Sequence, residues 1–154
     1  MRRWRHDGFC AFLLPSQRRR HDPMDIAPIL LVEDDFLIRA TLAAYLRERG
    51  GFTIVEADDA TEALAVIEAY PRLSILVTDI QIPGMLNGVG VAAAARRKWP
   101  DLPVLYVTGA WPRDGESTGG DKRDSYVEKP FEVSAILRRI RTMLHGADNP
   151  DFLT

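Results

Sequence analysis

Short apolar runs alternate along the chain with segments in which apolar residues recur at helical spacing. The runs predict strands buried on both faces, and they lie at residues 29–32, 52–55, 73–77, 102–107 and 126–127. The amphipathic segments predict helices at residues 36–49, 59–70, 89–99 and 133–144. Strands that alternate with helices indicate βαβ units and a parallel sheet with right-handed crossovers.

Five strands on this scale predict a flavodoxin-like, doubly wound parallel sheet with strand order 2-1-3-4-5 and helices on both faces. The first, third and fourth runs are solidly apolar, as central strands should be. The second and fifth runs are shorter or more polar, which is typical of edge strands. Gly50 and Gly51 should end the first helix, and Asp59 with Glu62 resembles a capping box that opens the second.

The fourth helix expected by this fold is weak. Residues 111–123 contain three Gly and one Pro, and no apolar residue follows Trp111. Such a segment cannot bury a helical face, and each Gly costs a helix roughly 1 kcal/mol. We predict a mobile loop, or at most one frayed turn, over residues 112–123.

Charge is unevenly distributed along the 154 residues. The first 24 carry six Arg against two Asp, whereas the remainder has 14 basic and 20 acidic residues. An acidic body argues against nucleic-acid binding. The apolar run at residues 9–14 is too short to span a membrane. Arg18–Arg20 stand where a signal peptide would have its cleavage site, which argues against a signal peptide. A basic tail that binds a membrane surface is an alternative that the sequence leaves open. The single cysteine, Cys10, fits a reducing compartment, so we expect a cytoplasmic protein.

Polar residues come directly after four of the predicted strands. In the 2-1-3-4-5 order, the carboxyl ends of these strands meet at one edge of the sheet. Each residue also has a purely structural explanation: Asp35 as a helix cap, Thr108 as a turn residue, Lys129 as a solvated side chain, Asp79 as a loop cap. The residues that should converge are Glu33, Asp34 and Asp35, then Asp79, then Thr108, then Lys129.

Clustered carboxylates of this kind suit a hard divalent cation. Two unit charges about 4 Å apart repel by roughly 4 kcal/mol at an effective dielectric near 20, and Mg²⁺ with oxygen ligands removes that cost. A carboxylate beside Mg²⁺ and an ammonium group is arranged to attack a phosphoryl group. None of the three histidines lies near this edge, so a zinc site is not expected, and a phosphohistidine donor would have to come from another protein.

Four motifs together resemble the receiver domain of bacterial two-component response regulators, of the single-domain type. They are Ile29–Asp35, Leu76–Asp79 with Pro83-Gly84, Val107–Gly109 and Glu128–Phe131, and the resemblance extends over roughly residues 28–144. It implies that a histidine kinase or a histidine phosphotransfer protein phosphorylates Asp79. It also implies that Asp34 binds Mg²⁺ directly, Glu33 through water, and Gln81 through its backbone carbonyl, beside Asp79 itself.

The resemblance assigns three further residues. Thr108 and Lys129 match the hydroxyl and the lysine that bind the phosphoryl group, and Tyr126 matches the aromatic switch position. The bond between Lys129 and Pro130 should be cis, as is typical of the family.

We therefore expect a stand-alone receiver that signals by phosphorylation-dependent protein contact and catalyses only its own phosphotransfer and dephosphorylation. The expected organisation is a flexible basic extension at 1–25, a receiver domain at 26–146 and a tail at 147–154. A phosphate sink, or a receiver module detached from a hybrid histidine kinase, is the alternative. A phosphatase of the haloacid-dehalogenase type is less favoured, because Gln81 stands where that class needs a second Asp. Stable membrane insertion is not expected, and the sequence specifies neither the downstream partner nor the oligomeric state.

Overall fold

A single parallel sheet of five strands forms the centre of the molecule. The structure, a computed structural model, describes residues 27–109 and 121–146. The strand order is β2-β1-β3-β4-β5, so the predicted order and the edge positions of the second and fifth strands are confirmed. The strands are β1 (Ile29–Val32), β2 (Ile54–Ala57), β3 (Ile75–Thr78), β4 (Val104–Thr108) and β5 (Asp124–Glu128).

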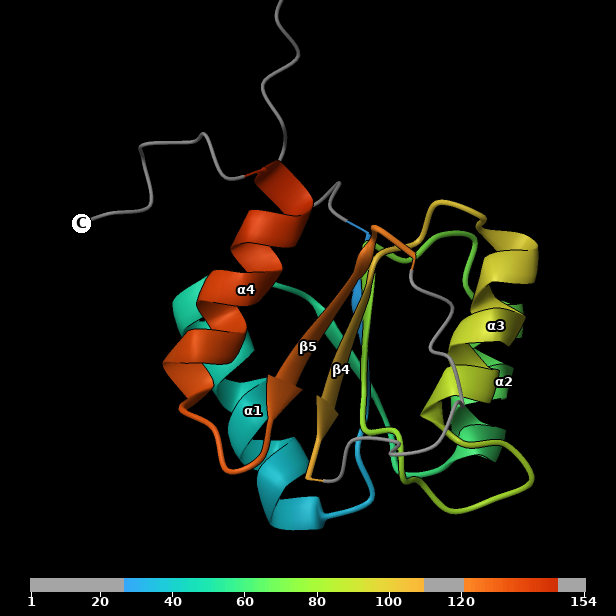
Figure 1. Ribbon diagram of the computed structural model, residues 1–154, viewed down its shortest axis with the longest axis horizontal. Coiled ribbons are helices and arrows are strands. Elements are labelled where there is room, and N and C mark those ends of the chain that lie inside the picture. Colours follow the sequence, from blue (N-terminus) through green and yellow to red (C-terminus); the bar gives the residue numbers. More distant parts are fainter. Residues whose placement is uncertain (1–26, 110–120, 147–154) are drawn as a thin grey trace, which may run out of the picture.

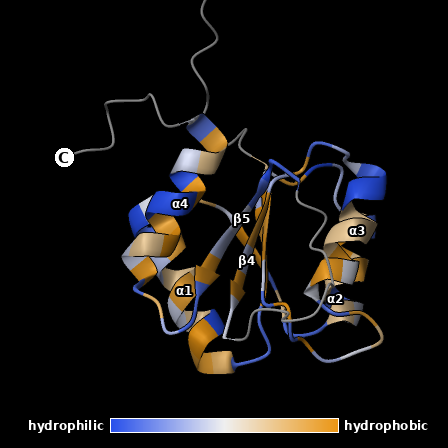
Figure 2. Cartoon of the chain, in the orientation of Figure 1, coloured by the Kyte–Doolittle hydropathy of each residue, from blue (hydrophilic) through white to orange (hydrophobic). Residues whose placement is uncertain are grey.

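Helices cover both faces of the sheet. In the part of the chain that the structure describes they are α1 (Phe36–Gly50), α2 (Ala60–Ala69), α3 (Gly88–Lys98) and α4 (Val133–His145). Figure 1 shows α1 and α4 on one side of the sheet and α2 and α3 on the other. Leu30 and Val32 of β1 pack into the core below α2 and α3, whereas Ile29 and Leu31 pack into the core below α1 and α4. Because β1 is buried on both faces, its apolar run is continuous, as Figure 2 shows for the central strands.

The predicted limits of several strands were wrong by about two residues. The second strand begins at Ile54 and not at Phe52, although Phe52 is buried. The amide of Phe52 donates to Leu46 O at 3.3 Å and the amide of Gly51 to Arg47 O at 3.1 Å, so this stretch closes α1 before the strand begins. The third and fourth strands likewise begin two residues later than predicted, at Ile75 and Val104, whereas β5 is longer than the two residues expected. The apolar pattern therefore identified residues that are buried, and some of these residues lie just before the first residue that pairs in the sheet.

The predicted capping box at the start of α2 is present in a modified form. The Asp59 side chain accepts a hydrogen bond from the Glu62 amide at 2.8 Å. The Glu62 carboxylate accepts in turn from the amide of Asp58 at 3.1 Å, one residue before the cap.

Most of the segment predicted to lack a helix lies outside the described residues. Residues 110–120 fall there, so the prediction of a mobile loop over residues 112–123 stays a prediction for that stretch. Residues 121–123 form a turn that leads into β5, and the Arg123 amide donates to Asp121 Oδ1 at 2.9 Å within it.

Candidate functional site

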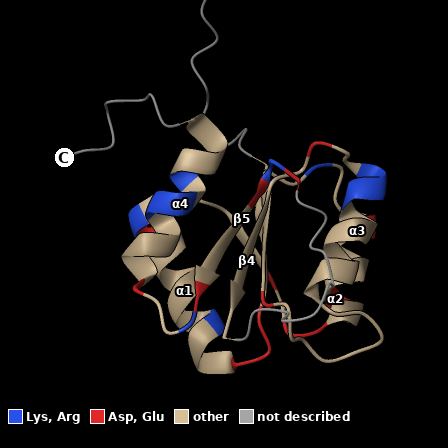
Figure 3. Ribbon diagram, in the orientation of Figure 1, with Lys and Arg blue, Asp and Glu red and all other residues tan. Residues whose placement is uncertain are grey.

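Three carboxylates meet at the carboxyl edge of the sheet. Val32 of β1 pairs with Thr78 of β3, so the residues that come after these two strands lie side by side. One oxygen each of Glu33, Asp34 and Asp79 lies within 4.8 Å of the other two. Glu33 and Asp79 are buried, with 3% and 7% of their surface exposed, whereas Asp34 faces solvent. Figure 3 shows acidic residues gathered at this edge of the sheet.

Lys129 joins two of these carboxylates. It comes directly after β5, and its Nζ donates to Glu33 Oε2 at 2.6 Å and to Asp79 Oδ2 at 2.7 Å. The Lys129 amide donates to Thr108 O at 2.9 Å, which holds this residue against the end of β4. The bond between Lys129 and Pro130 is cis, as the resemblance implied. The side chain is therefore not merely solvated.

Burial and charge act in opposite directions on Glu33 and Lys129. Burial raises the pKa of Glu33, and the hydrogen bond and charge of Lys129 only partly offset it. Burial alone would lower the pKa of Lys129, but hydrogen bonds to Asp79 and Glu33 outweigh burial and raise it. Lys129 therefore stays charged, and its ammonium group lowers the cost of ionising the buried Glu33.

The main chain around Asp79 is fixed by close contacts. The Asp79 amide donates to Val32 O at 3.1 Å, and Asp79 Oδ1 accepts from the Gln81 amide at 2.9 Å. The Gly88 amide donates to Ile80 O at 2.8 Å, which brings the start of α3 against the same turn. A Cβ atom at Gly88 would lie 2.0 Å from the carbonyl oxygen of Asp79. Only glycine allows α3 to approach the Asp79 peptide this closely.

Gly88→Ala should lower the free energy of unfolding by about 2–3 kcal/mol, because overpacking of a tight site costs roughly that much. Chemical unfolding monitored by circular dichroism measures this change. Gly109→Ala is the matched control, since among the described residues its Cβ would meet only Lys129 Cβ, at 3.8 Å, and it should change stability by no more than about 0.5 kcal/mol. Equal stability of the two variants would contradict the tight contact at Gly88.

Thr108 and Tyr126 lie on the neighbouring strands. Thr108 is the last residue of β4 and is buried, and it pairs with Glu128 of β5. The ring of Tyr126 stacks on that of Tyr106, with centroids 5.2 Å apart and planes inclined by 14°. Thr108 and Tyr126 line the same cavity of about 290 Å³, together with Val127 and Glu128 of β5. The structure thus brings Thr108 next to Lys129 through the main chain and stacks Tyr126 of β5 on Tyr106 of β4.

Asp35 caps the start of α1, which is the structural role that the sequence allowed for it. Its side chain accepts from the Ile38 amide at 3.0 Å and caps the first turn of α1. Its own amide donates to Glu33 Oε1 at 3.2 Å. Asp35 therefore shapes the acidic loop without being one of the three clustered carboxylates.

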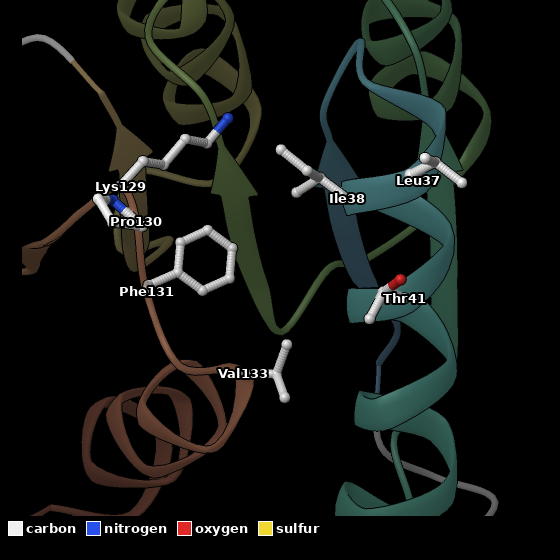
Figure 4. A pocket seen from close by; sticks show the side chains of 7 residues that line it. All are labelled: Leu37, Ile38, Thr41, Lys129, Pro130, Phe131 and Val133. Carbon is white, nitrogen blue, oxygen red and sulfur yellow. The ribbon is translucent and has the colours of Figure 1, made fainter.

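A groove beside the acidic cluster was not predicted from the sequence. It has a volume of about 610 Å³, and α1 forms one wall while the chain from Lys129 to Val133 forms the other (Figure 4). Leu37 is 72% exposed, and its neighbour Phe36 is 68% exposed. An indication was present in the sequence, because Phe36 and Leu37 fall outside the stripe that α1 buries. The lining residues are Leu37, Ile38, Thr41, Lys129, Pro130, Phe131 and Val133.

The donor set at the acidic edge fits a hard divalent cation. Three carboxylates converge and one ammonium offsets only part of their charge. Carboxylate oxygens, with water and a backbone carbonyl to complete the set, are the ligands that Mg²⁺ prefers.

No described helix has the length and apolar character needed to cross a membrane.

Comparisons with known proteins all lead to the same family. A model of the response regulator receiver domain matches residues 29–141. The response regulator protein FleR of Pseudomonas aeruginosa is 39% identical over 113 residues, which cover 72% of this chain and 23% of FleR. The chain spans from about a quarter to about half of the curated relatives it matches.

Solved receiver structures have the same fold. The receiver domain of the hybrid histidine kinase CckA is 27% identical with a TM-score of 0.64, and the match covers 77% of this chain and 99% of that one. TrrA of Thermotoga maritima, in complex with Mg²⁺ and BeF, is 26% identical with a TM-score of 0.66, and the match covers 77% and 100%.

Proposed function

This chain belongs to the response regulator receiver domain family, and we propose that Asp79 is the residue through which it accepts a phosphoryl group. The observation that carries the proposal is the contact of Lys129 Nζ with Asp79 Oδ2 at 2.7 Å, inside a cluster of three carboxylates. Asp79 is thereby a buried carboxylate that already has a cation beside it. A phosphoryl group bound there would find the same cation for its oxygens.

In the proposed transfer, a carboxylate oxygen of Asp79 attacks the phosphorus of a phosphohistidine. The new O–P bond forms as the P–N bond breaks, and the electron pair of that bond leaves with the imidazole. The Gln81 amide, which donates to Oδ1 at 2.9 Å, orients the carboxylate. Lys129 and the Thr108 hydroxyl then bind phosphoryl oxygens, and Tyr126 responds to the movement of Thr108.

The acidic residues also suit a role in holding Mg²⁺. Asp34 and Asp79 would bind it through their carboxylates, Gln81 through its backbone carbonyl, and Glu33 through water. When bound, Mg²⁺ would neutralise charge that develops on the phosphoryl oxygens. Glu33 has a second role in this scheme, because it shares Lys129 with Asp79 and so keeps the ammonium group at the acceptor.

The groove beside Lys129 suits the protein that brings the phosphohistidine. A donor must place its phosphoryl group over a nearly buried Asp79, so it must contact the adjoining surface. That surface is apolar along Leu37, Ile38 and Phe131, and Lys129 lines both the groove and the acceptor site. The partner we infer is an apolar helical face of a histidine kinase or of a histidine phosphotransfer protein.

The proposal extends to the whole chain. The receiver domain occupies residues 26–146, with a basic extension at 1–25 and a tail at 147–154. It acts in the cytoplasm as a response regulator receiver that signals by protein contact, and it catalyses only its own phosphotransfer and dephosphorylation. A phosphate sink or a receiver module of a hybrid histidine kinase would use the same acceptor and would differ only in the fate of the phosphoryl group.

Incubation with acetyl phosphate and Mg²⁺ tests the acceptor directly. Intact-mass measurement should show the gain of one phosphoryl group, and this gain should require the metal. An unchanged mass, together with no spectral response to beryllofluoride, would overturn the proposal. Rapid turnover of a generic phosphate ester would favour an aspartyl-phosphate phosphatase instead.

A further inference from the structure

Arg39 of α1 reaches back to the acidic loop that comes after β1. Its Nη1 donates to the carbonyl oxygen of Glu33 at 2.6 Å and lies 3.4 Å from that of Asp34. Its Nε lies 3.7 Å from Glu56 Oε2 on β2. Only 14% of the Arg39 side chain is exposed, and its guanidinium lies 5.8 Å from the centre of the Phe36 ring. Arg39 therefore links the loop to both α1 and β2.

The position of Arg39 is unfavourable for its own helix. It lies in the first turn of α1, where the helix dipole disfavours a cation. The hydrogen bond from the charged guanidinium to the loop offsets this effect. The placement of Arg39 is thus explained by the loop and not by α1.

The carbonyl of Glu33 needs such a donor because the strand has ended. The amide of Glu33 still bonds to Ala57 O at 3.1 Å, but β1 stops at Val32. Glu33 is buried, and a buried carbonyl group beyond a strand needs a partner from elsewhere; the carbonyl of the exposed Asp34 is a second, longer contact of the same guanidinium. By bonding to two successive carbonyls, one guanidinium fixes the orientation of two peptide planes, and these planes set where the Glu33 and Asp34 carboxylates point.

We propose that Arg39 is a positioning residue, which holds the main chain of Glu33 and Asp34 so that their carboxylates converge on Asp79. This inference rests on the proposed function for its metal, but the loop geometry on which it depends exists without metal. Loss of Arg39 should have two separate consequences: the acidic loop loosens, and binding of a divalent cation weakens, while the rest of the domain keeps its stability.

Arg39→Met tests the proposal in the full chain, because Met keeps the apolar stem and removes the donors. Arg47→Met is the matched control: Arg47 also lies on α1 and bonds to Glu56 Oε1 at 2.8 Å and to Ile54 O at 3.0 Å, away from the acidic loop. Mg²⁺ alone is titrated by calorimetry, and amide exchange of residues 33–36 is measured without metal.

The Kd for Mg²⁺ should rise about 10-fold in Arg39→Met and by less than about 2-fold in Arg47→Met, in the range known for groups that orient metal ligands. Amide exchange at Asp34 and Asp35 should be faster in Arg39→Met only. Arg39→Lys, which restores one donor, should recover part of both effects, and it replaces the Met variant if that variant does not fold.

Amide exchange in the acidic loop that is unchanged in Arg39→Met would overturn the positioning role. Equal changes of amide exchange and of the Kd for Mg²⁺ in Arg39→Met and Arg47→Met would overturn it as well. If the unsubstituted chain binds no Mg²⁺, the proposed function loses its metal, whereas the exchange measurement still decides the role of Arg39.

Discussion

Asp79→Asn should abolish phosphoryl incorporation from acetyl phosphate, because it removes the proposed acceptor. The amide keeps the size of the carboxylate but is a poor nucleophile, and it removes the charge that Lys129 Nζ contacts at 2.7 Å. The measurement is intact mass after incubation with acetyl phosphate and Mg²⁺. The loss should be complete, because no other carboxylate of the cluster has both Lys129 and the Gln81 amide as partners.

Asp35→Asn provides the control for this loss. Asp35 lies next to the cluster but caps α1, and asparagine caps helices about as well. Its phosphoryl incorporation should equal that of the unsubstituted chain. A phosphoryl group that persists on Asp79→Asn would show that another residue is the acceptor, and peptide mapping would locate it.

Lys129→Met is expected to destabilise the metal-free protein by about 2 kcal/mol. Removing one partner of a buried ion pair costs about 3–5 kcal/mol, and the partial exposure of Lys129 reduces this. The cause is that Glu33 and Asp79 then face each other and Asp34 without a cation. Unfolding in urea, with and without Mg²⁺, measures the change.

Mg²⁺ should restore more stability to this variant than it adds to the unsubstituted chain, since a site with one positive charge less binds a cation more tightly. Phosphoryl incorporation should still fall, because Lys129 no longer binds a phosphoryl oxygen. Burial raises the pKa of Glu33, so the deficit should shrink as the pH falls and Glu33 becomes protonated. Lys122→Met, at an exposed turn residue, is the control, and an equal loss in both variants would contradict the role of Lys129 as the counter-charge.

The sequence alone determined the class of fold and which polar residues lie at the carboxyl edge of the sheet. The apolar runs that predict β1, β3 and β4 are buried on both faces in the structure, because burial of a central strand requires a continuous apolar stretch. The strand order then implied that Glu33 and Asp79 are neighbours, since Val32 and Thr78 pair. The strand limits were less accurate, because apolar character reports burial and not hydrogen bonding, as Phe52 shows.

Only the tertiary structure decided how these residues contact one another. The bonds from Lys129 join residues 50 and 96 positions apart, and the approach of Gly88 to Asp79 depends on how α3 packs. The apolar residues outside the buried stripe of α1 indicated an exposed apolar surface, but the groove between α1 and Phe131 and the bonds of Arg39 to the acidic loop depend on tertiary contacts. The physical reason is that periodicity arises from neighbouring residues and reveals which face is buried, whereas a distance between remote side chains is set by the packing of whole elements.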